Sequence, residues 1–203
     1  MKTLLINVSL LVLGGLFFAC GGDNPKDDDG NNTPEVQYSD EAEELYHFEA
    51  FSLKPYEINA LIYLPDATAN IGAATDPKMV HEMDDYQWDL YVGQNFHMHI
   101  EDWGEEDALK AHLEELKDQS AIYDIEFLEQ EDNFVYYKST LKVDGKSAKS
   151  DVGVDHVTFH VVAQHKLDGI NYIFRTNKEG HPKPITDYMA TSVQNVKEIE
   201  DPA

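Results

Sequence analysis

The sequence contains one cysteine, Cys20, so the chain has no partner for an internal disulfide. After residue 19 it also lacks an uncharged apolar run long enough for a membrane-spanning helix, which needs about 20 residues. Common enzyme signatures are missing as well: there is no Gly-x-Ser-x-Gly, no Gly-x-Gly-x-x-Gly, no phosphate loop and no His-Glu-x-x-His. These absences favour a non-catalytic protein.

Basic residues are scarce. The chain has 15 Lys and Arg against 39 Asp and Glu, which gives a formal net charge of −24 at pH 7. Such a chain repels phosphate groups, so we expect no binding to nucleic acid and no adhesion by charge to anionic lipid. The acidity is compatible with cationic ligands or metal ions, and equally with a solvated acidic surface.

The N-terminal segment has the order of a secretory signal: Lys2, then an uncharged and mainly apolar run over residues 4–19. The run ends in Phe17-Phe18-Ala19-Cys20, which resembles the lipobox of bacterial lipoprotein signal peptides. The resemblance implies that residues 1–19 are removed and that Cys20 carries lipid such as palmitate. We therefore expect a secreted protein held by Cys20 at the outer membrane, on its periplasmic or its cell-surface side.

Residues 20–38 are expected to form an acidic disordered tether, because Asp23–Asn32 has no large apolar side chain with which to build a core. Its stretch Lys26-Asp27-Asp28-Asp29 resembles the Lys-plus-acid signal that exports some Gram-negative lipoproteins to the cell surface. A plain acidic tether is the alternative interpretation.

Residues 39–203 are predicted to form a single α+β domain. Period-two alternation of apolar residues, interrupted by turn residues, predicts four hairpins, at about 51–64, 88–100, 122–141 and 157–174. Apolar residues at helical spacing predict a central helix from about Glu105 and a C-terminal helix that carries Ile185 to Val196. A short helix is expected from Ser39 to about Phe48, and residues 66–84 are expected to be irregular. The prediction is an antiparallel meandering sheet of hairpins with the central and C-terminal helices packed on it.

This order of two hairpins, helix, two hairpins and helix resembles the PsbP-like α/β/α sandwich. The resemblance covers residues 48–199 approximately, and Ile62-Tyr63-Leu64-Pro65 is its most specific piece. It implies a binding or assembly protein, and it brings no catalytic residues to this chain.

Histidines are patterned on two of the predicted strands. His97 and His99 alternate with the apolar residues of one strand, and His156 and His160 alternate with those of another. Zinc needs three or four such ligands, so these four histidines would form a site for zinc or another transition metal if the two strands lie close together. The alternative is that they are ordinary polar residues of a half-exposed face. No other cofactor is predicted.

The favoured function is therefore a membrane-anchored lipoprotein with a non-catalytic binding or assembly domain, whose partner is a small ligand or an envelope protein. One alternative is a metal-dependent enzyme that uses the histidine-bearing sheet face. The other alternative is a structural component of the cell envelope.

Overall fold

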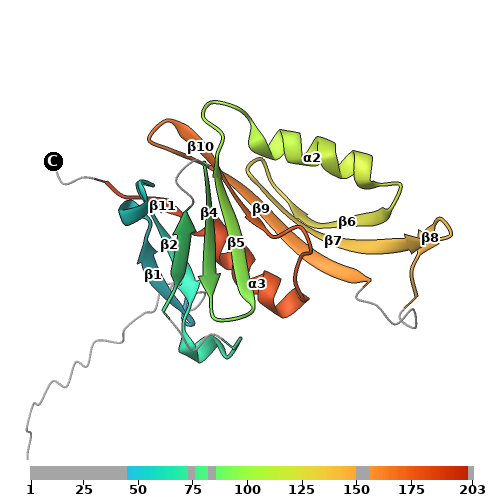
Figure 1. The fold of residues 1–203 in the computed structure, drawn as a ribbon, viewed down its shortest axis with the longest axis horizontal. Coiled ribbons are helices and arrows are strands. Elements are labelled where there is room, and N and C mark those ends of the chain that lie inside the picture. Colours follow the sequence, from blue (N-terminus) through green and yellow to red (C-terminus); the bar gives the residue numbers. More distant parts are fainter. Residues whose placement is uncertain (1–44, 73–75, 82–85, 150–155, 201–203) are drawn as a thin grey trace, which may run out of the picture. The chain divides into compact units, whose positions relative to one another are not determined.

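Antiparallel hairpins build most of the fold, as the alternation of apolar residues predicts (Figure 1). The computed structural model describes residues 45–72, 76–81, 86–149 and 156–200, all of which belong to one unit, Tyr38–Ala203. The strands are β1 (Phe48–Ser52), β2 (Ala60–Pro65), β3 (Lys78–His81), β4 (Gln87–Val92), β5 (Phe96–Asp102), β6 (Tyr123–Gln130), β7 (Phe134–Val143), β8 (Lys146–Ser147), β9 (Val157–Leu167), β10 (Ile170–Thr176) and β11 (Lys197–Glu198). The helices are α2 (Ala108–Gln119) and α3 (Lys183–Gln194), with short 3-10 turns at η1 (Lys54–Tyr56) and η2 (Ala67–Ala69).

The strands form a large sheet and a small one. The large sheet has the order β3-β4-β5-β10-β9-β7-β6, and β8 pairs with the end of β7. The small sheet has the order β1-β2-β11. All of these pairings are antiparallel. Because β10 lies between β5 and β9, the two histidine-bearing strands are separated by one strand.

The two α-helices pack on opposite faces of the large sheet. Met189 and Val193 of α3 join the main core, whereas Leu109 and Leu116 of α2 join a smaller cluster. Successive residues of one strand belong in turn to the main core and to the smaller cluster. Val161 and Phe174 lie in the main core with α3, whereas Val162 and Ile173 lie in the smaller cluster with α2. Since successive strand residues point to opposite faces, this alternation places a helix on each side of the sheet.

The small sheet completes the main core. Ile58, Ala60, Ile62 and Leu64, in and before β2, are buried there together with residues of α3 and of the large sheet. The main core therefore spans both sheets, and the cluster under α2 does not.

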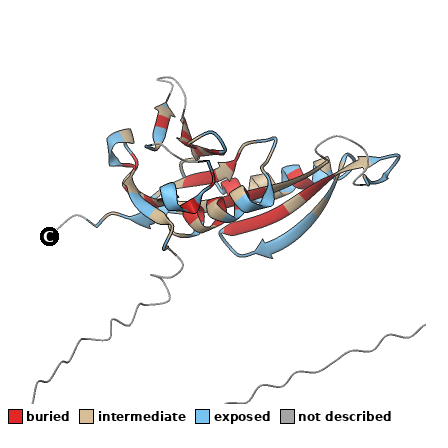
Figure 2. Ribbon diagram, turned by 90° about the horizontal axis from the view of Figure 1, so that it is seen from below, coloured by how far each residue is buried: buried red, intermediate tan, exposed pale blue. Residues whose placement is uncertain are grey.

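Strand β6 is the outer strand of the large sheet on the side away from β3. Figure 2 shows this exposed strand beside the buried β7. The pairing of β6 with β7 shifts register between Phe127 and Glu129, where the strand has a bulge.

The structure differs from the sequence-based prediction in several places. The hairpin predicted over 51–64 belongs to the separate small sheet, so the hairpins do not form one meandering sheet. Residues 78–81 form β3 within the segment expected to be irregular, and they pair with β4. Residues 45–47 form a turn and Phe48 starts β1, so the described part of the segment from Ser39 is not helical. Helix α3 ends at Gln194, so Val196 lies beyond the helix, although it packs into the same core.

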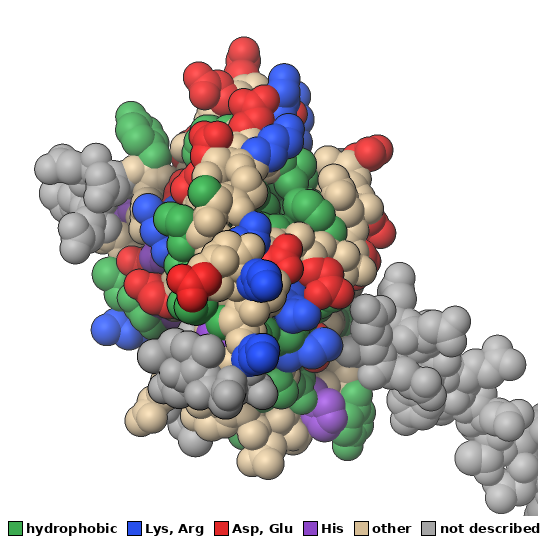
Figure 3. All heavy atoms as spheres, turned by 90° about the vertical axis from the view of Figure 1, so that its right-hand side faces the viewer, with side chains coloured by type: hydrophobic (Ala, Val, Ile, Leu, Met, Phe, Trp, Pro, Cys, Tyr) green, Lys and Arg blue, Asp and Glu red, His purple; other side chains and the backbone are tan. Residues whose placement is uncertain are grey.

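The predicted signal segment, Cys20 and the whole of the predicted tether lie outside the described residues. Within the part of the chain that is described, no helix has the length and apolar character needed to cross a bilayer. Figure 3 shows acidic and basic side chains interspersed on the face of the domain at the β8 end, so that face carries no patch of a single charge sign.

Candidate functional site

The face of the large sheet that α2 covers carries a row of polar side chains where the helix does not reach. Asp89 of β4 and Arg175 of β10 both lie directly opposite His99 of β5 in the strand register. His97 and Glu101 lie two residues to either side of His99 on β5, so they share its face. Three neighbouring strands therefore bring two imidazoles, two carboxylates and a guanidinium together.

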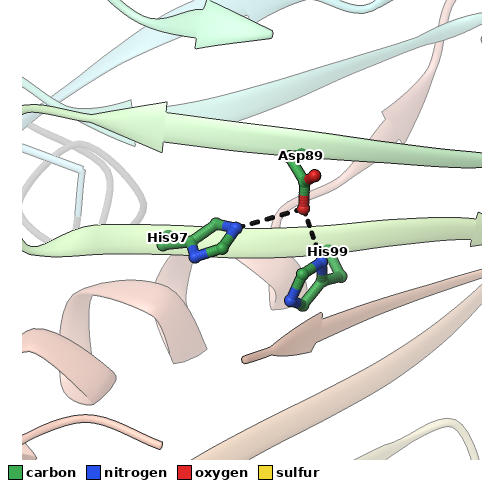
Figure 4. A group of neighbouring side chains, drawn as sticks. All are labelled: Asp89, His97 and His99. Carbon is green, nitrogen blue, oxygen red and sulfur yellow. Dashed lines mark hydrogen bonds and ion pairs between the residues drawn. The ribbon is translucent and has the colours of Figure 1, made fainter. Parts of the chain in front are cut away.

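Asp89 lies at the centre of the first part of this row (Figure 4). Its Oδ1 atom is 3.1 Å from Nε2 of His97 and 2.5 Å from Nδ1 of His99. The three side chains are partly accessible, with exposed fractions of 30% for Asp89, 24% for His97 and 17% for His99. Burial, helped by the neighbouring His97, lowers the pKa of His99 below its usual value of 6.5. Neutral imidazole is the form that coordinates metal ions.

Glu101 and Arg175 form an ion pair next to His99. The Nε group of Arg175 donates to Oε1 of Glu101 over 3.0 Å, and a second guanidinium nitrogen donates to the same oxygen. The indole N–H of Trp103 donates to the other carboxylate oxygen over 3.1 Å. The positive charge of Arg175 is thus compensated within the site.

A pocket of about 640 Å³ lies on the same face, between α2, the strands β7 and β9, and residues 177–182. Its wall includes His112 of α2, Tyr137 of β7, His160 of β9 and Arg175 of β10. Pockets of this size, about 300–1,000 Å³, are typical of small-molecule sites.

His160 and Tyr137 form a stacked pair of rings in the wall of the pocket. The two rings are stacked with their centroids 4.9 Å apart and an interplanar angle of 8°. Nε2 of His160 lies 3.0 Å from the Thr158 hydroxyl, and the Tyr137 hydroxyl lies 3.3 Å from Nε2 of His112. Burial lowers the pKa of both histidines to about 4 and raises the pKa of Tyr137. All three groups are therefore uncharged at neutral pH.

Residues 177–182 close one side of the pocket and connect it to the row on β5. Phe159 and His181 exchange two backbone hydrogen bonds, of 2.9 and 3.1 Å, which fasten this segment to β9. Gly180 has φ +70°, and a Cβ atom at that position would lie 2.6 Å from the His160 ring. The His181 side chain donates through Nε2 to the backbone carbonyl of His97 over 3.1 Å. The glycine thus allows the loop to approach the imidazole closely.

The structure separates the four histidines that were grouped from the sequence. His97 and His99 lie together with Asp89, which sequence reasoning missed. His156 and His160 line the pocket, on the far side of β10. Among the described residues, the cluster of side chains with the composition and proximity of a metal site is Asp89, His97 and His99, whose ligand atoms lie within 4.8 Å of one another.

Comparison with protein-family models gives no match, and a search of curated proteins finds no similar sequence. The site is therefore interpreted from its own geometry.

His112, Arg175 and His181 are the other residues of the site that sequence reasoning missed. His112 lies on α2 and lines the pocket. The arrangement offers two chemically different places on one face. One is a partly open pocket lined by uncharged histidine and tyrosine rings together with charged side chains, and the other is an accessible group of two imidazoles and a carboxylate.

Proposed function

We propose that this protein is a lipid-anchored binding protein whose folded domain takes a small ligand in the pocket between α2 and the large sheet. The observation that carries the proposal is the wall of that pocket, where His112, His160 and Tyr137 present neutral hydrogen-bonding groups beside a volume of about 640 Å³. Asn177 adds to this wall, because its side-chain oxygen is buried without a hydrogen-bond partner among the described residues. A buried acceptor is costly to leave unpaired, so it favours a ligand that donates a hydrogen bond.

The wall also indicates the class of ligand. Lys178, Glu115 and Glu179 line the pocket, and so does Arg175, whose charge is already compensated by Glu101. The wall therefore has no excess of positive charge. Tyr137 and His160, stacked on each other, add aromatic atoms to the lining. A ring-containing molecule with hydrogen-bonding groups and no negative charge fits these features.

The placement of α2 and α3 on opposite faces of an antiparallel sheet supports the proposed likeness to the PsbP-like sandwich. Binding and assembly proteins use that fold, in keeping with the proposed role. The lone cysteine after an apolar segment supports the proposed anchor.

The pocket can be tested by ligand-observed NMR with phenol, indole and benzamide as probes of the full chain purified in detergent. We expect at least one of them to bind. Gln119→Trp, at the mouth of the pocket on α2, should abolish the binding, whereas Lys117→Trp, on the exposed side of the same helix, should leave it unchanged. Absence of binding by all three probes, or equal binding by both variants, would contradict the proposal.

The anchor is tested separately. Cys20→Ser should release the protein from the membrane fraction and abolish its labelling by radioactive palmitate in a bacterial host. Membrane retention and labelling that persist in this variant would show that Cys20 is not the attachment site.

A further inference from the structure

The group formed by Asp89, His97 and His99 lies apart from the ligand pocket, and none of its three side chains lines that pocket. His97 and His99 are two residues apart on β5, and Asp89 lies on the adjacent β4, directly opposite His99. The two strands thus direct two imidazole nitrogens toward one carboxylate oxygen (Figure 4).

We propose that Asp89, His97 and His99 bind one divalent transition-metal ion of the zinc type, through Oδ1, Nε2 and Nδ1 respectively. Two histidines and one carboxylate, with further positions open, are the ligand set of many metal sites in proteins. The function is separate from ligand binding in the pocket and does not depend on it.

The distances are compatible with this ligand set. Zinc lies about 2.0–2.2 Å from nitrogen and oxygen ligands, so ligand atoms around one ion are about 3–3.5 Å apart. The separation between Asp89 and His97 is 3.1 Å. The separation between Asp89 and His99 is 2.5 Å and needs to widen by a fraction of an ångström to admit the ion.

Neighbouring residues hold the ligands in place. The Tyr91 ring stacks on His97 with centroids 4.3 Å apart, and His181 binds the backbone carbonyl of the same residue. Such outer contacts orient metal ligands and raise affinity. The Gln87 side-chain amide lies 3.1 Å from Nδ1 of His99, and it would have to move away from this nitrogen for the ion to bind there.

Charge and access also favour the site. Arg175 lies opposite His99 and is compensated by Glu101, so it opposes a bound metal ion less than a free guanidinium would. Because all three ligand side chains are partly exposed, an ion can enter from solvent and retain open positions for water. At those open positions, water or another small molecule could bind the metal ion.

The test is calorimetric titration of the full chain, purified in detergent without a histidine tag, with Zn²⁺ in excess Mg²⁺. The Mg²⁺ occupies surface carboxylates, which prefer hard cations. We expect one equivalent of Zn²⁺ to bind, and at least about tenfold weaker binding after His97→Ala, His99→Ala or Asp89→Asn. His81→Ala, on the adjacent β3, should bind Zn²⁺ as the unmodified protein does.

A second measurement does not depend on the folding of the variants. In the unmodified protein, NMR should show that Zn²⁺ shifts the imidazole ¹⁵N resonances of His97 and His99 and leaves those of His156 and His160 in place. Two results would overturn the proposal. One is weak binding of many equivalents of Zn²⁺ that is the same in Asp89→Asn, and the other is a Zn²⁺-induced shift of only the His156 and His160 resonances. Probe binding in the pocket is measured without Zn²⁺, so the two proposals can fail independently.

Discussion

The two faces of the large sheet differ although the same strands form both. On the α3 face, alternate residues of β4, β5 and β10 are apolar and fully or almost fully buried, as Leu90, Ile100 and Phe174 illustrate. On the other face the intervening residues include Asp89, His99 and Arg175, and α2 covers only a small apolar cluster. The comparison indicates that the α3 face supplies most of the stability of the fold. The α2 face can therefore hold polar and charged side chains without a large loss of stability.

The sharpest test of this difference uses two consecutive residues of β5. Ile100→Ala should lower the free energy of unfolding by about 2–5 kcal/mol, because it leaves a cavity in the main core. His99→Ala should lower it by about 1 kcal/mol or less, because it removes only partly exposed polar contacts. Chemical denaturation monitored by circular dichroism measures both values, and equal losses would show that the two faces contribute alike.

The next test concerns the loop that closes the pocket. Gly180→Ala should destabilise the protein by about 2–4 kcal/mol, since it combines the strain of a positive φ with a clash against the His160 ring and Thr158. Gly145→Ala is the matched control: its φ is +72°, close to the +70° of Gly180, but its Cβ would meet nothing within 4 Å. The control should cost only about 1–2 kcal/mol. If both variants lose the same stability, the loop does not pack on His160 as described.

The pocket face should also make stability depend on pH. The pKa of His160 is lowered by burial from 6.5 to about 4. Between these values the unfolded chain binds a proton that the folded chain excludes, so this contribution to stability is largest above pH 6.5 and decreases as the pH falls toward 4. Between pH 7 and pH 5 the unmodified protein should lose about 1–2 kcal/mol more than His160→Gln does.

Urea denaturation at several pH values would show this difference, and His112→Gln should shift the pH dependence in the same direction. Identical pH profiles for the unmodified protein and His160→Gln would mean that the imidazole is not buried in its neutral form.

The smallest expected effect concerns α2 itself. Asp107 caps the helix, since its side chain accepts a hydrogen bond of 2.9 Å from the backbone N–H of Lys110. Asp107→Ala should cost about 1 kcal/mol, and hydrogen exchange should rise in α2 but not in α3. Asp118→Ala, near the other end of the same helix, should have no such effect. Faster exchange in both helices would show that the two faces unfold as one unit.

Much of the fold could be predicted because local signals agree with the tertiary structure. The turn at Gly93-Gln94-Asn95 joins β4 to β5, and alternation on both sides of it identifies the buried residues. The short β3 was missed because only one of its four side chains, Met79, is buried, and one buried residue gives no alternation pattern. The end of α3 was placed too late because Val196 continues the apolar spacing of the helix, although it lies outside it.

The candidate site could be predicted only in part. Alternation placed His97, His99 and His160 on one face, but it carries no information on which strands are neighbours. The insertion of β10 between β5 and β9 separates the histidines, and the register of β4 against β5 brings Asp89 opposite His99. In the sequence, Asp89 is one polar residue between Trp88 and Leu90. The chain has 39 acidic residues, and no neighbouring residue marks Asp89 as different from the others.

The exposed outer strand β6 has a consequence for self-association. An outer strand leaves backbone donors and acceptors on which a second copy of the chain can add a strand. Asp124, Glu126 and Glu129 lie along β6, and its bulge falls between Phe127 and Glu129. Two copies that approached edge to edge would bring like charges together along a distorted strand. The charges and the bulge of this edge therefore disfavour the pairing of neighbouring copies into a continuous sheet.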